Sequence, residues 1–233
     1  MVAEKVFTPN LYYIIIFFYH PVLNGLLNFL HADQIEGKTA RNEINLNDFS
    51  ELKTSLFSKP IVLMGMAGCG KSSVGKILAD KLNIKFVDLD NLIEKHFNKT
   101  IPEIFEQSGE KAFREIESKL LQDLLTNESM ESKKIVLALG GGAACNAKSM
   151  QIILENAISF FIDVLPDEII ERMQKSRRKR PLLGSDETKI IKNVYKLYYD
   201  RYEFYNCASY RINGMVDQET IANKIKGVLE VTI

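Results

Sequence analysis

Residues 65–72 have the side chains and the spacing of a phosphate-binding loop. They read GMAGCGKS, which fits the pattern G-x-x-x-x-G-K-[ST] at every fixed position. Glycines allow backbone N–H groups to close around phosphate oxygens, and a helix starting here adds the partial positive charge of its N-terminus. In this pattern Lys71 reaches the β- and γ-phosphates and Ser72 offers its hydroxyl to Mg²⁺. The expected nucleotide-binding residues are Gly65, Gly68, Cys69, Gly70, Lys71, Ser72 and Ser73.

Two aspartates follow the next apolar run of the sequence. Asp88 and Asp90 lie at the end of the strand expected at 84–88. Side chains two residues apart on a strand point the same way, so we expect both carboxylates to face the phosphate end of the sheet. One can organise Mg²⁺, and the other can accept a proton or a hydrogen bond from a substrate hydroxyl. The alternative for Asp90 is helix capping, which would explain that residue but not the pair.

Strands and helices alternate from residue 59 to the C-terminus, which predicts a parallel α/β sheet covered by helices on both faces. In such sheets ligands bind beyond the carboxyl ends of the strands. Five apolar runs predict strands, at 60–64, 84–88, 134–139, 158–164 and 209–213. Helical periodicity predicts helices at 71–82, 91–97, 110–125, 148–155, 166–175, 187–202 and 218–229. Between two of these, Thr100 and Glu103 predict a capping box for a helix that Gly109 breaks.

Residues 1–58 form an N-terminal extension that carries none of the chemical motifs. The segment 6–30 has no formally charged side chain, and a membrane helix needs about 20 apolar residues. His20, Pro21 and Asn24 interrupt the segment, so membrane contact is possible but not favoured over a partly ordered extension. A helix packed on the main domain is a third alternative. A polar linker at 32–46 and a short helix at 47–57 complete the expected extension.

Composition excludes several classes of protein. The 233 residues contain 30 Lys and Arg against 30 Asp and Glu, which leaves no basic excess to hold nucleic acid. Three cysteines without CxxC spacing exclude a disulfide framework and a cysteine zinc site. They fit a reducing compartment, and we expect a cytoplasmic monomer.

A basic run at 177–180, RRKR, allows several interpretations in isolation. It fits a solvated patch, a nucleic-acid contact or a nuclear signal. Because a predicted helix precedes the run and Pro181 and Gly184 follow it, we favour a mobile lid over about 176–186.

Six motifs in order make the chain resemble the shikimate kinase family. They are the loop at 65–72, Asp88-x-Asp90, FREIE at 113–117, GGG at 140–142, RPLL at 180–183 and RYEFY at 201–205. Together they extend over roughly residues 59–230. The resemblance implies the P-loop NTPase fold of the nucleoside monophosphate kinase-like type. Its catalytic domain would be 59–233, with a substrate-binding region at about 90–125.

The resemblance also implies a reaction, in which ATP and Mg²⁺ phosphorylate the 3-hydroxyl of shikimate in aromatic amino-acid biosynthesis. Arg114 and Arg201 are then the partners of the substrate carboxylate, since guanidinium groups bind carboxylates in a planar, bidentate manner. The remaining roles are substrate contacts by Gly140, Gly141 and Gly142, hydroxyl binding by Asp90, Mg²⁺ binding by Ser72 and Asp88, and charge neutralisation at the γ-phosphoryl by Lys71 and Arg180. Glu117 shares a helical face with Arg114 and is expected to orient Arg114 or Asp90.

Two other functions compete with this interpretation. Another small-molecule P-loop kinase, such as a gluconate or nucleoside monophosphate kinase, would share the phosphate loop. A nucleotide kinase, however, needs more arginines for a second phosphate. A binding protein on the same fold would have lost Lys71, Asp90 or an arginine, and this chain keeps all of them. The sequence leaves open whether Arg172 or Arg177 contacts adenine.

Overall fold

The computed structural model describes residues 59–127, 134–175 and 187–231. The N-terminal extension 1–58, its apolar segment 6–30 and the lid expected at 176–186, with Arg177 and Arg180, lie outside these residues. The domain boundary expected at residue 59 therefore stays a prediction. Among the described helices, none is both long enough and apolar enough to cross a bilayer.

Five parallel strands form one sheet, as the alternation of apolar runs and helices predicts. They are β1 (Ile61–Met64), β2 (Lys85–Asp88), β3 (Ile135–Ala138), β4 (Ile158–Asp163) and β5 (Tyr210–Asn213). Their order across the sheet is β2-β3-β1-β4-β5. Every residue of β1 and β3 is buried, because central strands of such a sheet are covered on both faces. Because β3 lies between β1 and β2 and all three run parallel, their carboxyl ends lie side by side at one end of the sheet.

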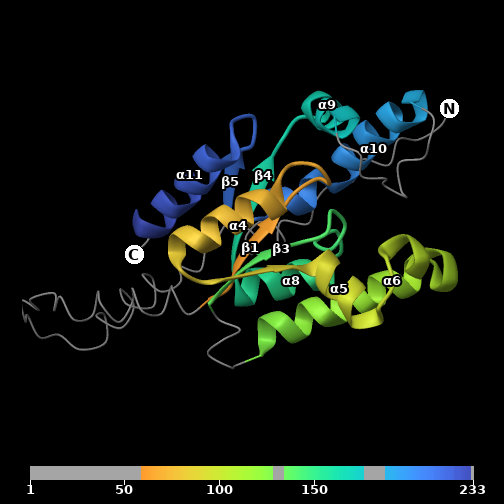
Figure 1. Ribbon diagram of the computed structural model, residues 1–233, viewed down its shortest axis with the longest axis horizontal. Coiled ribbons are helices and arrows are strands. Elements are labelled where there is room, and N and C mark those ends of the chain that lie inside the picture. The colour runs from red at the N-terminus through yellow and green to blue at the C-terminus, as the bar shows by residue number, and fades with distance from the viewer. Residues whose placement is uncertain (1–58, 128–133, 176–186, 232–233) are drawn as a thin grey trace, which may run out of the picture. The chain divides into compact units, whose positions relative to one another are not determined.

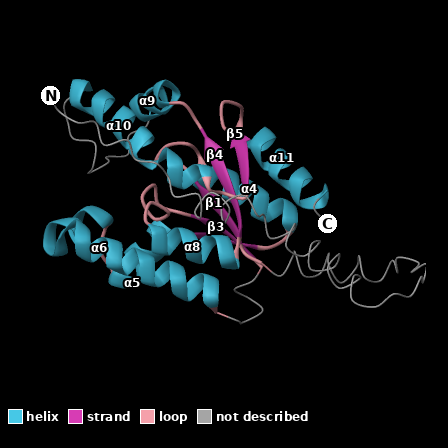
Figure 2. Cartoon of the chain, turned by 180° about the vertical axis from the view of Figure 1, so that it is seen from behind, coloured by secondary structure: helices cyan, strands magenta, loops and turns pink. Residues whose placement is uncertain are grey.

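Helices cover both faces of this sheet. Figure 1 shows α4 (Lys71–Leu82) and α11 (Gln218–Val231) together on one side, and Figure 2 shows the same arrangement from behind. On the other side lie α5 (Leu89–Phe97), α6 (Ile101–Thr126) and α8 (Ala147–Asn156). The remaining pair, α9 (Pro166–Lys175) and α10 (Glu187–Asn206), pack against each other.

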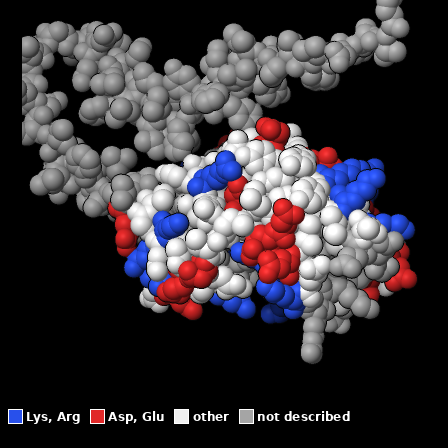
Figure 3. Space-filling model, turned by 90° about the horizontal axis from the view of Figure 1, so that it is seen from above, with Lys and Arg blue, Asp and Glu red and all other residues white. Residues whose placement is uncertain are grey.

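Charges of both signs lie side by side on the surface of the described domain. Figure 3 shows Lys and Arg side chains interspersed with Asp and Glu side chains on the face that it presents. Several charged side chains of the described residues pair along a helix, as Lys226 does with Glu230 at 3.6 Å. Positive charge for binding an anion must then come from a few individual side chains rather than from a field over the whole face.

The two halves of α6 are separated at Gly109, as the sequence predicts. Thr100 caps the first half in a capping box: its hydroxyl accepts from the Glu103 N–H, and its own N–H donates to the Glu103 carboxylate at 2.7 Å. Gly109 has φ 76° and ψ 168°, a conformation that is almost restricted to glycine. The break redirects the second half of the helix, which carries Arg114 and Glu117.

Two sequence-based expectations need correction at helix ends. Helix α5 begins at Leu89 rather than Asn91, because the Asp88 carboxylate accepts from the Asn91 N–H at 3.2 Å and caps the helix. Asp90 therefore lies in the first helical turn, and the argument that both aspartates point the same way from a strand is wrong. The capping alternative for Asp90 is also wrong, since Asp88 is the cap. Helix α10 continues to Asn206, which places Tyr205 on the same helix as Arg201.

The break at Gly109 gives a test that depends on backbone conformation alone. We expect Gly109→Ala to lower the free energy of unfolding by about 1–3 kcal/mol, because alanine is strained at this φ and ψ. Apart from the adjacent residues and the backbone of its own helix, no atom lies within 4 Å of a methyl group placed at this position, so packing against other residues does not change. Urea unfolding of both proteins measures the difference.

Gly227→Ala in α11 is the matched control, since its methyl group also meets nothing within 4 Å. Gly227 is helical, so the free energy of unfolding of this variant should rise by roughly 0.5–1 kcal/mol. Equal effects of the two substitutions would contradict the assigned break.

Candidate active site

The phosphate-binding loop joins β1 to α4, the context that the sequence pattern requires. Lys71 is buried, and its Nζ donates to the carbonyl oxygens of Gly65 and Met66, both at 2.9 Å. Gly70 directly precedes α4 with φ 102°, so the loop turns tightly into the helix N-terminus. The lysine ammonium group is thus folded back over the loop, within reach of an anion that the backbone N–H groups would hold.

Ser72 and Asp88 are brought together beside this loop. The Ser72 Oγ donates to the Asp88 Oδ2 at 2.5 Å, although one residue lies in the first turn of α4 and the other ends β2. A hydroxyl and a carboxylate oxygen are ligands that Mg²⁺ accepts when it is held partly by nucleotide phosphates. Within the described parts of the chain, no three His, Cys, Asp or Glu side chains cluster as a metal site. The pair fits a Mg²⁺ ion that the nucleotide helps to bind.

A side chain at any of the three glycines after β3 would meet a close neighbour. A Cβ at residue 140 would lie 2.5 Å from the Asp90 Oδ1 and 2.8 Å from the Glu117 Oε1. One at Gly141 would lie 3.0 Å from the backbone nitrogen of Ala67 in the phosphate-binding loop. One at Gly142 would lie 2.6–2.7 Å from the Arg114 guanidinium group. The glycine loop, residues 140–142, therefore lets the expected substrate residues and the phosphate-binding loop close on one another.

Arg114 and Glu117 form an ion pair at the edge of the glycine loop. Arg114 Nη1 donates to Glu117 Oε2 at 2.6 Å, and Nη2 contacts the exposed Glu110 at 3.4 Å. Glu117 is only 2% exposed, and this burial raises the pKa of its carboxyl group. The neighbouring Arg114 opposes that shift, whereas the charge of Asp90 adds to it. The expected role of Glu117 in orienting Arg114 agrees with this contact.

Helix α10 approaches the glycine loop from the other side. Arg201 Nη1 donates to the carbonyl oxygen of Gly141 at 2.9 Å, and the Tyr205 hydroxyl donates to the same oxygen. Tyr205 belongs to the RYEFY motif, but no role is predicted for it and the helix expected at 187–202 ends before it. Its spacing, four residues after Arg201, is the signal that could have placed both on one helical face.

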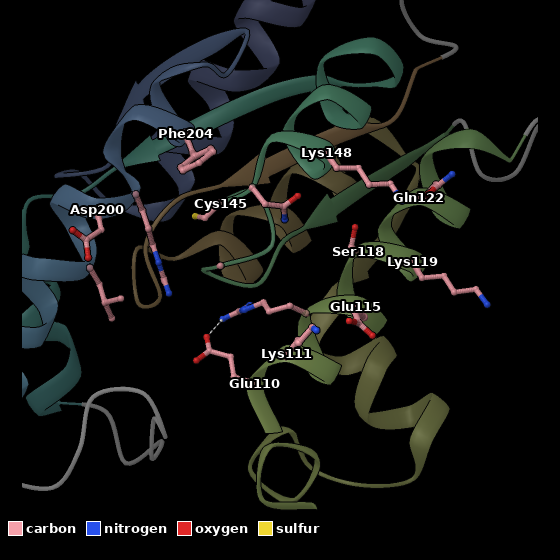
Figure 4. A pocket seen from close by; sticks show the side chains of 15 residues that line it. Glu110, Lys111, Glu115, Ser118, Lys119, Gln122, Cys145, Lys148, Asp200 and Phe204 are labelled. Atoms are coloured by element: carbon pink, nitrogen blue, oxygen red, sulfur yellow. Dashed lines mark hydrogen bonds and ion pairs between the residues drawn. The ribbon is translucent and has the colours of Figure 1, made fainter. Parts of the chain in front are cut away.

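A cleft of about 820 Å³ opens between α6 and α10. Figure 4 shows it from close by, with a dashed line joining Glu110 to the Arg114 guanidinium group. Arg114 and Arg201 line the cleft from these two helices, and Gly142 and Cys145 line it between them. Two guanidinium groups on facing walls can bind one carboxylate from both sides. The arginines singled out from sequence spacing therefore meet at one cavity.

Arg172 connects the phosphate-binding loop with the loop after β5. Its Nη1 donates to the Cys69 carbonyl oxygen at 3.3 Å and its Nη2 to the Gly214 carbonyl oxygen at 3.0 Å. Glu168 holds the third guanidinium nitrogen at 2.7 Å. Of the two arginines left open for adenine, Arg172 thus borders the phosphate-binding loop, while Arg177 lies outside the described residues.

A family model described as shikimate kinase matches residues 67–230 of this chain. A shikimate kinase from Clostridium beijerinckii is 39% identical over 170 residues, which cover 72% of this chain and 94% of the relative. One from a Sulfurihydrogenibium species is 37% identical over 171 residues, which cover 73% of this chain and 96% of the relative. The chain belongs to the shikimate kinase family.

Solved shikimate kinases share the fold. The enzyme from Bacteroides thetaiotaomicron superposes with a TM-score of 0.68 at 31% identity, covering 74% of this chain and 98% of that one. The Acinetobacter baumannii enzyme, solved in complex with shikimate, gives a TM-score of 0.67 at 30% identity, covering 77% and 97%. The resemblance recognised in the six motifs and the P-loop fold class that it implies are confirmed.

The burial of Glu117 predicts a pH-dependent loss of stability in this protein. Its pKa is raised above the ordinary value of 4.5 in the folded protein, so the folded state keeps the proton to higher pH than the unfolded state does. As pH rises above 4.5, the wild type should therefore lose free energy of unfolding relative to Glu117→Gln, which cannot ionise. Urea unfolding of both proteins at several pH values up to neutrality measures the difference.

Glu110→Gln, which removes the exposed partner of the same arginine, is the control and should keep the pH dependence of the wild type. If the free energy of unfolding of the wild type, relative to Glu117→Gln, stayed constant or increased with rising pH, the raised pKa of Glu117 would be contradicted.

Proposed function

We propose that this shikimate kinase transfers the γ-phosphoryl group of ATP to the 3-hydroxyl of shikimate, giving shikimate 3-phosphate and ADP. The observation that carries the proposal is the glycine loop, at which Asp90, Arg114 and Arg201 meet next to the phosphate-binding loop. The family match and the relative solved with shikimate support the same substrate. The reaction is a step of aromatic amino-acid biosynthesis.

Nucleotide binding is assigned to Gly65, Gly68, Cys69, Gly70, Lys71, Ser72 and Ser73. Lys71 moves from the two loop carbonyls that it now contacts to the phosphate oxygens of ATP. Ser72 and Asp88 would hold Mg²⁺, which would supply positive charge beside the phosphates. Because phosphoryl transfer is loose, this positioning and neutralisation supply most of the rate.

Substrate binding is assigned to the two arginines that line the cleft and to the glycine loop beside them. Arg114 and Arg201 bind the shikimate carboxylate, and Gly140, Gly141 and Gly142 bring the backbone close to the ring. Asp90 lies against Gly140 and accepts the hydrogen bond of the attacking hydroxyl, as a positioning group and base. Glu117 fixes the direction of Arg114 through their ion pair.

The remaining assignments rest on the sequence alone. Arg180, in the RPLL motif, neutralises charge on the γ-phosphoryl group and belongs to the lid, and both lie outside the described residues. The absence of a nucleic-acid partner, the monomeric state and the cytoplasmic location stay predictions. So does the lower preference given to membrane contact through residues 6–30.

ADP release with different acceptors tests the proposal. We expect the purified chain, with ATP and Mg²⁺, to release ADP rapidly with shikimate and slowly with gluconate or a nucleoside monophosphate. Lys71→Ala should lower turnover of shikimate by about a thousandfold, because it removes a buried positive charge that would neutralise the transferred phosphoryl group. Lys76→Ala, an exposed lysine one turn further along α4, is the matched control and should keep wild-type activity.

Faster ADP release with gluconate than with shikimate would assign the chain to the competing gluconate-type activity. Near-normal turnover by Lys71→Ala would contradict the role of the phosphate-binding loop.

A further inference from the structure

More donors meet at the Gly141 carbonyl oxygen than one oxygen can hold well. Arg201 Nη1 donates to it at 2.9 Å, the Tyr205 hydroxyl donates to it, and the Cys145 Sγ lies 3.7 Å away. A carbonyl oxygen has two lone pairs, so the weakest or the most mobile of three donors can be replaced. The same Tyr205 hydroxyl also lies 3.8 Å from the Met66 Sδ, so Tyr205 contacts both the glycine loop and the phosphate-binding loop.

The three donors differ in their freedom to leave. Arg201 lines the cleft and carries a charge, so an anion there offers it stronger, charge-assisted hydrogen bonds than a carbonyl does. Tyr205 is 1% exposed and packs on Phe161 with ring centroids 5.2 Å apart, which keeps it in place. Burial raises the pKa of Tyr205 well above its ordinary value, so the hydroxyl remains a donor. Cys145 offers only a weak S–H group.

We propose that Tyr205 is a positioning residue for the substrate carboxylate: its hydroxyl keeps the Gly141 carbonyl bonded while Arg201 turns to the anion in the cleft. This inference rests on the proposed function, since it takes the anion to be the carboxylate of shikimate. Tyr205 touches no reacting atom and acts through Arg201 and the glycine loop.

Without the hydroxyl, the Arg201 Nη1 group must serve both the Gly141 carbonyl and the carboxylate, because a carboxylate held by both terminal nitrogens takes Nη1 from the carbonyl. If it binds the carboxylate, the half-buried Gly141 carbonyl keeps only the distant thiol, and a buried acceptor without a partner is unfavourable. If Nη1 stays on the carbonyl, the carboxylate loses one of the hydrogen bonds that Arg201 can donate to it. In both cases the affinity for the carboxylate falls, while the affinity for ATP stays unchanged.

Tyr205→Phe tests this directly, because phenylalanine keeps the ring in the core and removes only the hydroxyl. We expect the KM for shikimate to rise about tenfold, with kcat and the KM for ATP changing by less than about twofold. Shikimate methyl ester, which lacks the carboxylate charge, supplies the decisive comparison. The ratio of kcat/KM for shikimate to that for the ester should fall about tenfold in this variant.

Tyr198→Phe is the matched control. Tyr198 lies on the same helix, is 6% exposed, and its hydroxyl donates to the Asp163 Oδ1 at 3.0 Å instead of the glycine loop. This variant should lose stability in thermal unfolding but keep the wild-type preference for shikimate over the ester.

The outcomes separate the inference from the function that it assumes. An equal loss of kcat/KM for shikimate and the ester in Tyr205→Phe, or an equal loss of preference in Tyr198→Phe, would overturn the positioning role. Wild-type protein that does not phosphorylate shikimate would overturn the proposed function, and the carboxylate role with it. A wild type that is active and a Tyr205→Phe variant with unchanged KM would overturn the inference alone.

Discussion

The close approach of side chains to the glycine loop is the constraint on which the whole site depends. At residue 140, Asp90 and Glu117 occupy the space that a side chain would take. At residue 141, the backbone of the phosphate-binding loop lies 3.0 Å from the Cβ position. At residue 142, the Arg114 guanidinium group occupies the space of a side chain. Any larger residue would push a functional group outward. The glycines thus leave room for the protein's own functional side chains as well as for the proposed substrate. The site is compact because the glycine loop carries no side chains of its own.

The fold brings these groups together through its strand order. Because β3 lies between β1 and β2, the glycine loop emerges between the phosphate-binding loop on one side and Asp88 on the other. The two aspartates then divide the work: Asp88 caps α5 and bonds Ser72 on the nucleotide side, while Asp90, two residues further, lies against Gly140. Helices α6 and α10 add one arginine each from outside the sheet. The phosphate-binding loop and the residues proposed to bind substrate therefore both border the glycine loop.

Features set by neighbouring residues could be predicted from the sequence. The phosphate-binding loop, the capping box at Thr100 and the break at Gly109 each depend on a few adjacent positions, and all three are present. The directions of Asp88 and Asp90 could not be predicted, because they depend on where β2 gives way to α5. The hydrogen bond from Tyr205 to Gly141 joins residues 64 positions apart, and no local pattern encodes it. The motifs indicated which residues matter, and only the packing shows that they converge on one loop.

Equilibrium titration of shikimate into Gly142→Ala tests this account most directly. The new methyl group would lie 2.6–2.7 Å from the flexible end of Arg114, so the arginine should move while the fold stays intact. Gly227→Ala adds the same methyl group where nothing lies within 4 Å and serves as the control. The account predicts that the Kd for shikimate rises at least about tenfold in Gly142→Ala, with the Kd for ATP within about twofold of wild type. Wild-type affinity for shikimate in Gly142→Ala would contradict it.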